Sequence, residues 1–538
     1  MRSYHSTRGR HTRRLVALGI VAALVAAACG GSDDDDDTSD ATTDAGTETT
    51  VADDPTTTVA SSQPTGGDDD TTTTDADAPA TTAAPVDVAS RFTGNDAFCV
   101  AGAAPAEAPA DVDAGITSTA IQVAHVRNKL EDLVSIGFAS DLGDQNDFAQ
   151  TFVDVINDEC GGIHGRQLEL VNVEVPVLGF APDADAVYQE ACITIAEEQH
   201  AVVAWSNSGV GNPLGACLTG QNETIFLATY DFGASDFERS NGRLFTVTHA
   251  PADILTYAVR ELADELAGKT IGVVFDDGDP NPEIIEQGLL DAMDAVGLEP
   301  ARVDVIPCPN GPPCNEGLIA SVQGMRDAGV DAMFVLLDGI SMSGYMAELV
   351  TQGAEPGSIQ FYGTSFLAQD SELLAGKLIE FGGQGAGELY DGAVIIGSNQ
   401  EGDYRAADYQ PDAFFEMCNA TYADHSSAAG APFDPSASDD EARFASNVSG
   451  HCAFVRMLAR SIEAAGPNPT RDDIAAAVAA LGDVQLGSGT PASFTPGKPT
   501  APDAIVRNVF EYPCSVPVEN SVGHCVRFDS DFLPIPEG

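Results

Sequence analysis

The chain has 538 residues, with 83 acidic and 24 basic side chains, so its formal net charge is −59 at neutral pH. A negative charge of this size argues against nucleic acid and anionic membrane surfaces as partners. About 450 residues follow position 90, enough for two domains with full hydrophobic cores.

The first 29 residues carry the features of an export signal. Five arginines precede an apolar run over residues 15–28, and that run is too short to span the roughly 30 Å core of a bilayer. Small residues stand directly before Cys29, which resembles a lipobox. We therefore expect residues 1–28 to be a lipoprotein signal peptide and Cys29 to carry the lipid. Ordinary cleavage nearby, with Cys29 left free, is the alternative, and the choice between Sec and twin-arginine export stays open.

Residues 29–90 are expected to form a disordered acidic tether rich in Thr, Ala and Asp. Between residues 30 and 85 there are 15 acidic side chains, no Lys and no Arg. Such a composition buries too little apolar surface to offset the entropy of an ordered chain. The sequence thus predicts an exported protein on the outer face of the cytoplasmic membrane, in contact with it only through the N-terminal lipid.

From residue 116 onward, short apolar β-rich runs alternate with segments of helical periodicity. Strands are expected at residues 121–126, 168–175, 201–205, 224–228, 270–275, 302–306, 332–337 and 360–362. Helices are expected at residues 148–156, 183–198, 254–266, 283–296, 316–327 and 343–351. This alternation predicts an α/β fold of two doubly wound, Rossmann-like lobes with parallel sheets, joined by a hinge. In such sheets, ligands bind beyond the carboxyl ends of the strands.

Four segments resemble one known family. Residues 115–123 resemble the opening strand of type I periplasmic-binding proteins of the leucine/isoleucine/valine-binding group. Residues 156–166 match that group's turn of Ile-Asn, Gly-Gly-Ile and Gly-Arg, residues 201–211 are similar to its third strand and ligand loop, and residues 494–498 resemble its late Pro-Gly-Lys turn. The resemblance implies a protein that captures a small molecule between two lobes and delivers it to the permease of an ABC importer.

The lobe order of that family divides this chain into four parts. Residues 116–249 are expected to begin lobe 1, residues 250–398 to form lobe 2, and residues 399–500 to return to lobe 1. Residues 501–538 would then form a C-terminal segment at lobe 2 and the hinge.

The resemblance also places ligand contacts in particular loops. It assigns them to Arg127, Ser208, Gly209, Ala228 and Tyr230 in the first lobe, and to Asp276, Asp338, Ser341 and Ser365 in the second. In amino-acid binders of the family, the loop of Ser208 holds a carboxylate, whereas the glutamate that grips the ammonium group is replaced here near Ser365. The expected ligand is therefore a small polar solute, an amino acid, an amide or a related molecule, and leucine itself should bind weakly.

Several of these residues have a structural alternative. Arg127 could be a surface charge on a long loop, and Ser208 could cap the following helix. Asp276 could cap the helix that begins near Glu283. Tyr230 could serve lobe packing.

Eleven cysteines are present, and removing Cys29 leaves ten, which suits five disulfides in an oxidising compartment. Cys308–Cys314 and Cys514–Cys525 can close local loops. We expect the others to pair across elements as Cys192–Cys217, a bridge that family members share, Cys418–Cys452 and Cys99–Cys160. Since no cysteine or histidine cluster has zinc-site spacing, neither a metal nor another cofactor is expected.

The sequence also argues against an enzyme. Residues 339–343 read Gly-Ile-Ser-Met-Ser and miss the GxSxG nucleophile motif at the last position. An exported hydrolase is the weaker alternative. A surface receptor of the same fold, which senses a ligand without transporting it, is the stronger one. We expect a monomer.

Overall fold

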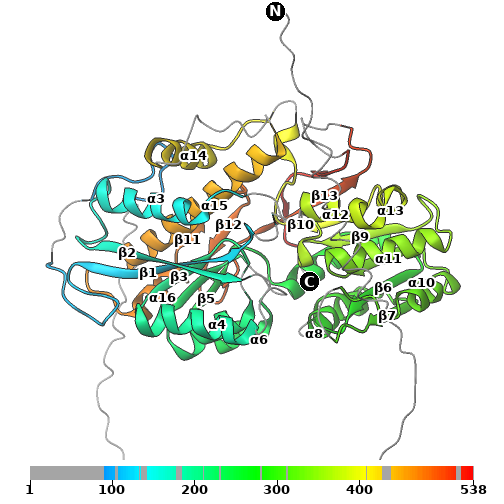
Figure 1. Cartoon of the computed structure of the whole chain (residues 1–538), viewed down its shortest axis with the longest axis horizontal. Coiled ribbons are helices and arrows are strands. Elements are labelled where there is room, and N and C mark those ends of the chain that lie inside the picture. The colour runs from blue at the N-terminus through cyan, green and yellow to red at the C-terminus, as the bar shows by residue number, and fades with distance from the viewer. Residues whose placement is uncertain are drawn as a thin grey trace, which may run out of the picture. The chain divides into compact units, whose positions relative to one another are not determined.

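The computed structural model describes residues 90–536, apart from segments 103–106, 132–133, 135–141, 177–183, 210, 230–231, 279–280, 310–312, 407–408, 427–437 and 516–522. The expected signal peptide, Cys29 and residues 30–89 of the expected tether lie outside the described residues. Ala89–Gly538 form one compact unit. Its two large sheets each define a lobe (Figure 1).

The first sheet has five parallel strands in the order β2 (Gln167–Pro176), β1 (Ala120–Lys129), β3 (Val203–Ser206), β4 (Ile225–Ala228) and β5 (Leu244–Thr246). Its central strands are apolar on both faces because helices cover both. In β1, Val123 packs with α3 (Gln145–Asp158) and α15 (Asp439–Ala465), and Val126 packs with α4 (Ala184–Cys192) on the other side. These continuous apolar runs are typical of buried parallel sheets.

The second sheet is mixed. Five parallel strands, β10 (Val394–Gly397), β9 (Gln360–Thr364), β8 (Ala332–Leu336), β6 (Ile271–Asp276) and β7 (Arg302–Ile306), lie side by side in that order. The C-terminal part of the chain then adds β13 (Ala504–Glu511) and β14 (Cys525–Phe528) antiparallel beyond β10, and β15 (Leu533–Pro534) pairs with β13. The expected parallel pattern therefore holds up to β10, and the returning C-terminal segment breaks it.

Helices cover both faces of this second sheet as well. One face packs against α7 (Pro251–Leu266), α8 (Asn281–Ile285) and α9 (Asp291–Ala295). The other packs against α10 (Leu318–Asp327), α11 (Gly339–Thr351), α12 (Glu372–Gly382) and α13 (Gln384–Tyr390). The α/β fold with two Rossmann-like lobes, expected from the alternation, is thereby confirmed.

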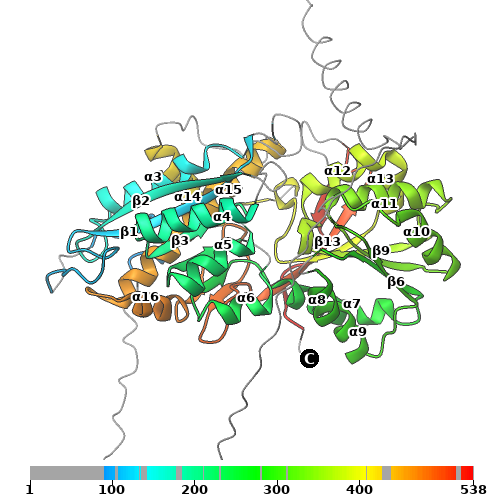
Figure 2. The same cartoon turned by 60° about the horizontal axis from the view of Figure 1, so that its bottom comes forward.

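The chain passes between the lobes three times. It leaves the first sheet between β5 and α7 and returns after β10 to α14 (Ala413–His425), α15, α16 (Arg471–Val478) and the β11–β12 hairpin (Gly482–Val484, Ala492–Phe494). These later elements pack with the first sheet, as both views show (Figures 1 and 2). The third passage leads from β12 to β13, so three connections form the hinge.

The Gly-Gly-Ile and Gly-Arg turn has a clear structural role. Gly162 has φ +70°, and a Cβ there would lie 2.1 Å from the carbonyl oxygen of Arg166. The Arg166 side chain is buried and donates to the carbonyl oxygens of Thr117 (2.6 Å), Ala110 (2.8 Å) and Pro467. The motif thus joins the start of β1 to the loop after α15.

Five disulfides connect the described residues: Cys99–Cys160, Cys192–Cys217, Cys308–Cys314, Cys418–Cys452 and Cys514–Cys525. They are the same five pairs that the sequence led us to expect. Two residue groups combine a carboxylate with cysteines, Asp276 with Cys308 and Cys314, and Glu511 with Cys514 and Cys525. Their sulfur atoms are all in disulfides, so each group offers a metal one carboxylate alone.

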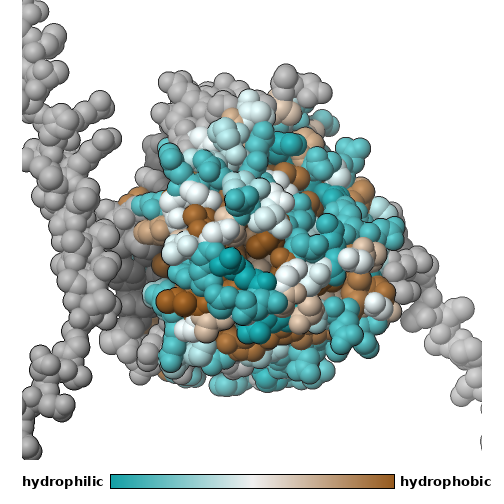
Figure 3. Space-filling model, turned by 90° about the vertical axis from the view of Figure 1, so that its right-hand side faces the viewer, coloured by the Kyte–Doolittle hydropathy of each residue, from teal (hydrophilic) through white to brown (hydrophobic). Residues whose placement is uncertain are grey.

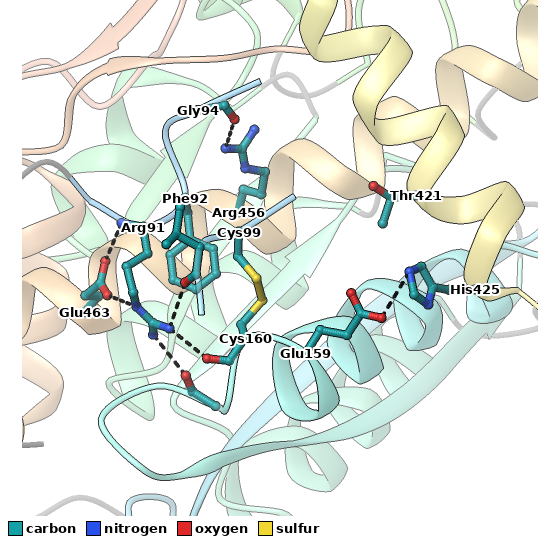
Figure 4. Close-up of a disulfide and its surroundings, with 12 residues drawn as sticks. Arg91, Phe92, Gly94, Cys99, Glu159, Cys160, Thr421, His425, Arg456 and Glu463 are labelled. Carbon is teal, nitrogen blue, oxygen red and sulfur yellow. Dashed lines mark hydrogen bonds and ion pairs between the residues drawn. A yellow bond between two sulfur atoms is a disulfide. The ribbon is translucent and has the colours of Figure 1, made fainter. Parts of the chain in front are cut away.

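The chain just after residue 90 is fastened to the first lobe (Figure 4). Arg91 pairs with Glu463 of α15 (Nε–Oε1 2.5 Å) and donates to the carbonyl oxygens of Cys160 (2.8 Å) and Gly162 (3.0 Å). Phe92 is buried, and Cys99 is bonded to Cys160. A pulling force applied to the N-terminal end of this segment would therefore act directly on the first lobe.

The end of the second lobe seen in Figure 3 shows hydrophobic residues interspersed among hydrophilic ones. Within the described part of the chain, no helix is long and apolar enough to cross a membrane.

Candidate functional site

The loops at the carboxyl ends of β1 and β3 are joined through Ser208. Its hydroxyl oxygen accepts a hydrogen bond from the backbone N–H of Asn128 (2.9 Å), and the Asn128 amide group donates to the carbonyl oxygens of Ser208 (2.6 Å) and Gly209 (2.5 Å). Ser208 therefore neither caps the next helix nor stands free. Ala228 is buried at the end of β4, and Tyr230 lies outside the described residues.

Arg127 lies near the end of β1, and its side chain is largely buried between two carboxylates. It pairs with Glu131 (Nη1–Oε1 2.8 Å) and with Glu174 of β2. Burial lowers the pKa of Arg127, but the two carboxylates raise it by a larger amount, so the net pKa is above the ordinary arginine value. Its charge is thus balanced within the lobe.

The predicted residues of the second lobe also have internal partners. Asp276, at the end of β6, accepts from the backbone N–H of Gly278 (2.9 Å) and from the amide group of Asn281 (3.1 Å). Burial raises the pKa of Asp276. These bonds shape the loop before α8.

Asp338 caps α11, which begins at Gly339 and therefore four residues before the expected start. Its carboxylate accepts from the backbone N–H groups of Ile340 (2.9 Å) and Ser341 (3.2 Å), and the Ser341 hydroxyl also donates to it. Ser341 is buried and accepts from the backbone N–H of Cys314 (2.7 Å). A serine held in this way cannot act as an exposed nucleophile. Ser365 is partly buried and precedes the short helix Phe366–Ala368.

A cavity of about 950 Å³ lies between the two lobes, in the region of these strand ends. From the first lobe come Asn207 after β3, Thr229 after β4, and part of α15. From the second lobe come Ala368 and Ser371 after β9, the start of α12, and the segment after β10. A concave site with contributions from both lobes is where an α/β protein of this kind binds a small molecule.

Of the nine predicted ligand-binding residues, Tyr230 lies outside the described residues, and none of the other eight is among the residues that line this cavity. The nearest in sequence are Asn207, next to Ser208, and Thr229, next to Ala228. Much of the lining was not expected from the sequence and comes from residues 399–412, 442–454 and 486–489. The first segment follows strand β10, the second lies in the first part of α15 and the third follows β11; none of them carries a motif.

The lining is acidic and aromatic. Its charged side chains are Glu372, Glu401, Asp403, Asp412 and Arg443, and its aromatic ones are Tyr404, Tyr409, Phe415, Phe454 and Phe532. Burial raises the pKa of Asp403 to about 6. The pKa of Glu401 is also raised, first by burial and then by neighbouring carboxylates.

A second cavity, of about 810 Å³, is lined by α6 (Ala234–Arg239), by residues of α7 and α8, and by residues 497–502. It is smaller, and its walls come largely from helices and the late Pro-Gly-Lys turn. We take the 950 Å³ cavity as the candidate site because the loops that follow β3, β4, β9 and β10 reach it.

Comparison with known proteins agrees with this arrangement. A family model described as "Periplasmic binding protein" matches residues 137–509, and the chain belongs to that family. It is a periplasmic-type solute-binding protein of the ABC transporter class, which acts outside the cytoplasm and is not an enzyme. A search of curated proteins finds no match.

Three solved structures illustrate the likeness. A solute-binding protein of an ABC transporter from Rhodopseudomonas palustris HaA2, in complex with p-hydroxybenzoic acid, is 13% identical with a TM-score of 0.53, covering 78% of this chain and 98% of its own. A fatty acid ABC transporter substrate-binding protein from Thermomonospora curvata is 16% identical, with a TM-score of 0.51 and coverage of 78% and 94%. A leucine binding protein from Thermotoga maritima is 13% identical, with a TM-score of 0.50 and coverage of 77% and 99%. At such identities the likeness shows the fold.

Proposed function

We propose that this protein captures a small polar organic solute in the 950 Å³ cavity and hands it to the permease of an ABC importer. The observation that carries the proposal is the cavity itself, since both lobes of a solute-binding fold line it. A ligand that touches both lobes favours the closed arrangement by its greater affinity for that state. The hinge, which consists of the three chain connections between the lobes, permits such a movement.

The nine residues suggested by the family resemblance remain part of this proposal as contacts made when the lobes close. Ser208 and Ala228 adjoin lining residues, which supports them most. Arg127, Asp338 and Ser341 are the least supported, because each already has a partner inside its own lobe.

A sensing receptor of the same fold is the second candidate function, and it would use the same cavity. The relatives differ in the ligands that they bind, among them a hydroxybenzoic acid and, by its name, fatty acid. An assay of uptake in cells separates the two functions. Deletion of the gene should abolish import of the ligand by a transport protein and leave import unchanged for a sensor.

The proposal is tested by a thermal-shift and native mass spectrometry screen of the secreted chain against amino acids, amides, amines, ureas, short peptides and aromatic acids. We expect one class to raise the melting temperature and to bind as a single molecule. An affinity in the micromolar range corresponds to about 8 kcal/mol. Turnover of any compound in the screen, or binding of none, would contradict the proposed function.

We also propose that Cys29 carries a lipid that holds the mature chain at the membrane. The change Cys29→Ala is expected to move the protein from the membrane fraction to the soluble fraction, because no described helix could replace the anchor. Fractionation followed by immunoblotting measures this. The melting temperature should be unchanged, since the described fold begins about 60 residues later. Retention of the variant in the membrane fraction would refute the lipid anchor.

A further inference from the structure

One wall of the 950 Å³ cavity is formed by the segment after β10, and it carries Glu401, Asp403 and Asp412. Backbone N–H groups satisfy part of their hydrogen-bonding capacity, with Tyr404 donating to Asp403 (2.7 Å) and Phe415 donating to Asp412 (2.8 Å). Among the residues that the structure describes, no Lys or Arg forms an ion pair with any of the three. The fourth lining carboxylate, Glu372, is paired with Arg405.

The positively charged side chains at and near the cavity already form ion pairs with carboxylates of this chain. Arg443 of α15 is the sole Lys or Arg among the lining residues, and its guanidinium pairs with Asp440 (Nη2–Oδ1 3.0 Å). Arg127, at the end of β1, is held between Glu131 and Glu174. An anionic ligand would therefore enter a space whose described cations already have carboxylate partners.

The carboxyl groups of this wall also act on one another. Burial, and after it the charge of Asp412, raise the pKa of Asp403 to about 6. The pKa of Glu401 is raised by burial and then by Asp370, Glu372 and Asp403. Carboxyl groups that lie near one another without a cation between them ionise less readily, and a bound cation favours their ionised forms.

The same negative charges also act on a neighbouring tyrosine. The pKa of Tyr409 is raised by burial and by the charges of Asp403, Asp412 and Glu416. Burial alone raises the pKa of Asp370, just behind the wall, to about 6. The negative field therefore extends from the segment after β10 to the first turn of α14.

Aromatic side chains also line the same cavity, and the Tyr404 ring already lies beside a cation, with the guanidinium carbon of Arg405 4.8 Å from its centroid. Tyr404, Tyr409 and Phe415 belong to the acidic wall, and Phe454 and Phe532 contribute from α15 and the C-terminal segment. Aromatic faces attract organic cations and also cover their apolar parts. Carboxylates beside aromatic rings thus match an ammonium group attached to a hydrocarbon body.

We propose that the solute captured in this cavity is an organic cation, an amine or quaternary ammonium compound with an apolar portion. This inference rests on the proposed function and names the chemical class of ligand for the same site. Such a ligand differs from those of the family's amino-acid binders, in which the loop of Ser208 holds a carboxylate. Because the wall lies after β10, it is separate from the position of Ser365.

The test compares compounds of one shape that differ in charge. Isopentylamine, leucine and 4-methylpentanoate form one series, and tyramine, tyrosine and 3-(4-hydroxyphenyl)propionate form the other. Calorimetry on the secreted full chain at pH 7 should show each amine binding at least about tenfold more tightly than the carboxylate of its series, a difference of about 1.4 kcal/mol. The wider screen, sorted by charge, should return cations as its strongest ligands.

Variants locate the effect at the acidic wall. Asp403→Asn and Asp412→Asn keep the shape and the backbone contacts, and each should weaken amine binding by about ten- to a hundredfold, as expected for the loss of one charge-assisted contact. Glu388→Gln is the matched control, because it removes one negative charge from an exposed position on α13 and should change nothing.

The pH dependence provides an independent measure. The pKa values of Asp403 and Asp370 are about 6, the pKa of Glu401 is raised as well, and a bound cation favours the ionised forms of all three. Amine affinity should therefore rise from pH 5 to pH 7, with protons released on binding. The other charged groups beside this segment are Glu372, Asp412, Glu416 and the ion-paired Arg405 and Arg443.

The possible results are distinct. If anionic or neutral solutes bind and cations do not, or if the two Asn variants bind amines as the wild type does, the assignment of a cationic ligand is overturned while the solute-binding function stands. If no solute of any charge binds, the proposed function fails and this inference fails with it.

Discussion

Replacing Arg405 with methionine is expected to lower the free energy of unfolding by about 3–5 kcal/mol, the cost of leaving one partner of a buried ion pair alone. Arg405 ends the short helix Asp403–Arg405, and its guanidinium forms two hydrogen bonds with Glu372 at the start of α12, one of them 2.8 Å long. The side chains are 4% and 11% exposed. Glu372 also accepts from the backbone N–H of Val526 on β14 (2.9 Å), so three elements meet at this pair.

Urea unfolding of matched variants checks this expectation. Glu372→Gln together with Arg405→Met should recover a large part of the loss, because no buried charge is then left without a partner. Arg239→Met is the control, since Arg239 is 60% exposed in its pair with Asp236 and such pairs contribute at most about 1 kcal/mol. Equal losses in Arg405→Met and Arg239→Met would show that the pair near the cavity has no special role.

Acidification is expected to destabilise the first lobe through a buried histidine pair. The Nε2 atoms of His125 on β1 and His451 on α15 are 3.2 Å apart, and both rings are fully buried. His125 lies 3.0 Å from the Asn172 side chain (Nδ1–Oδ1) and beside Trp205, and His451 lies 2.9 Å from the carbonyl oxygen of Asn447. Burial, together with the nearby His451 and Arg127, lowers the pKa of His125 to about 3, and burial lowers the pKa of His451 to about 4.

The sign of the effect follows from proton uptake. Unfolded histidines bind protons below about pH 6.5, whereas the folded pair stays neutral until about pH 4, so stability is lost as the pH falls from 6.5 to 4. Each unit of pKa difference corresponds to about 1.4 kcal/mol, which predicts a loss of several kcal/mol. Asp370 and Asp403 act in the opposite direction, because their raised pKa values make the folded state bind protons between about pH 4 and 6.

Comparison of variants separates the two contributions. The double change His125→Gln and His451→Gln should flatten the decline of the unfolding free energy between pH 6.5 and 4, while the carboxylate contribution stays the same. The exposed His200→Gln should keep the wild-type pH dependence. A double variant with the wild-type slope would refute the role of the pair.

Eight of the nine strands up to residue 364 could be predicted from the sequence, because each is a short apolar run between turn residues. The three-residue strand β5 and the short helices α5 (Asn212–Ala216) and α6 were missed. The helix α15 was missed, although it is 27 residues long. Its buried face includes Ser449, His451 and Arg456, so polar residues interrupt the apolar periodicity that would reveal a helix. Likewise, nothing local in residues 504–528 shows that β13 and β14 join the second sheet antiparallel.

The candidate site was less predictable than the fold. An aspartate after a strand can serve a ligand or cap a helix, and for Asp338 the structure shows the cap. The acidic wall after β10 lines the cavity together with the start of α12 and part of α15. These parts come together only once the chain has returned to the first lobe. The spacing of these residues along the sequence therefore does not reveal the candidate site.

The most direct test of solute capture between the lobes is a crystal structure of the protein with the strongest ligand from the screen. We predict density for one molecule in the 950 Å³ cavity. It should be contacted by Asp403 or Asp412 of the acidic wall and by Asn207 or Thr229 of the first lobe. Density at a site on one lobe alone, or outside this cavity, would contradict the account.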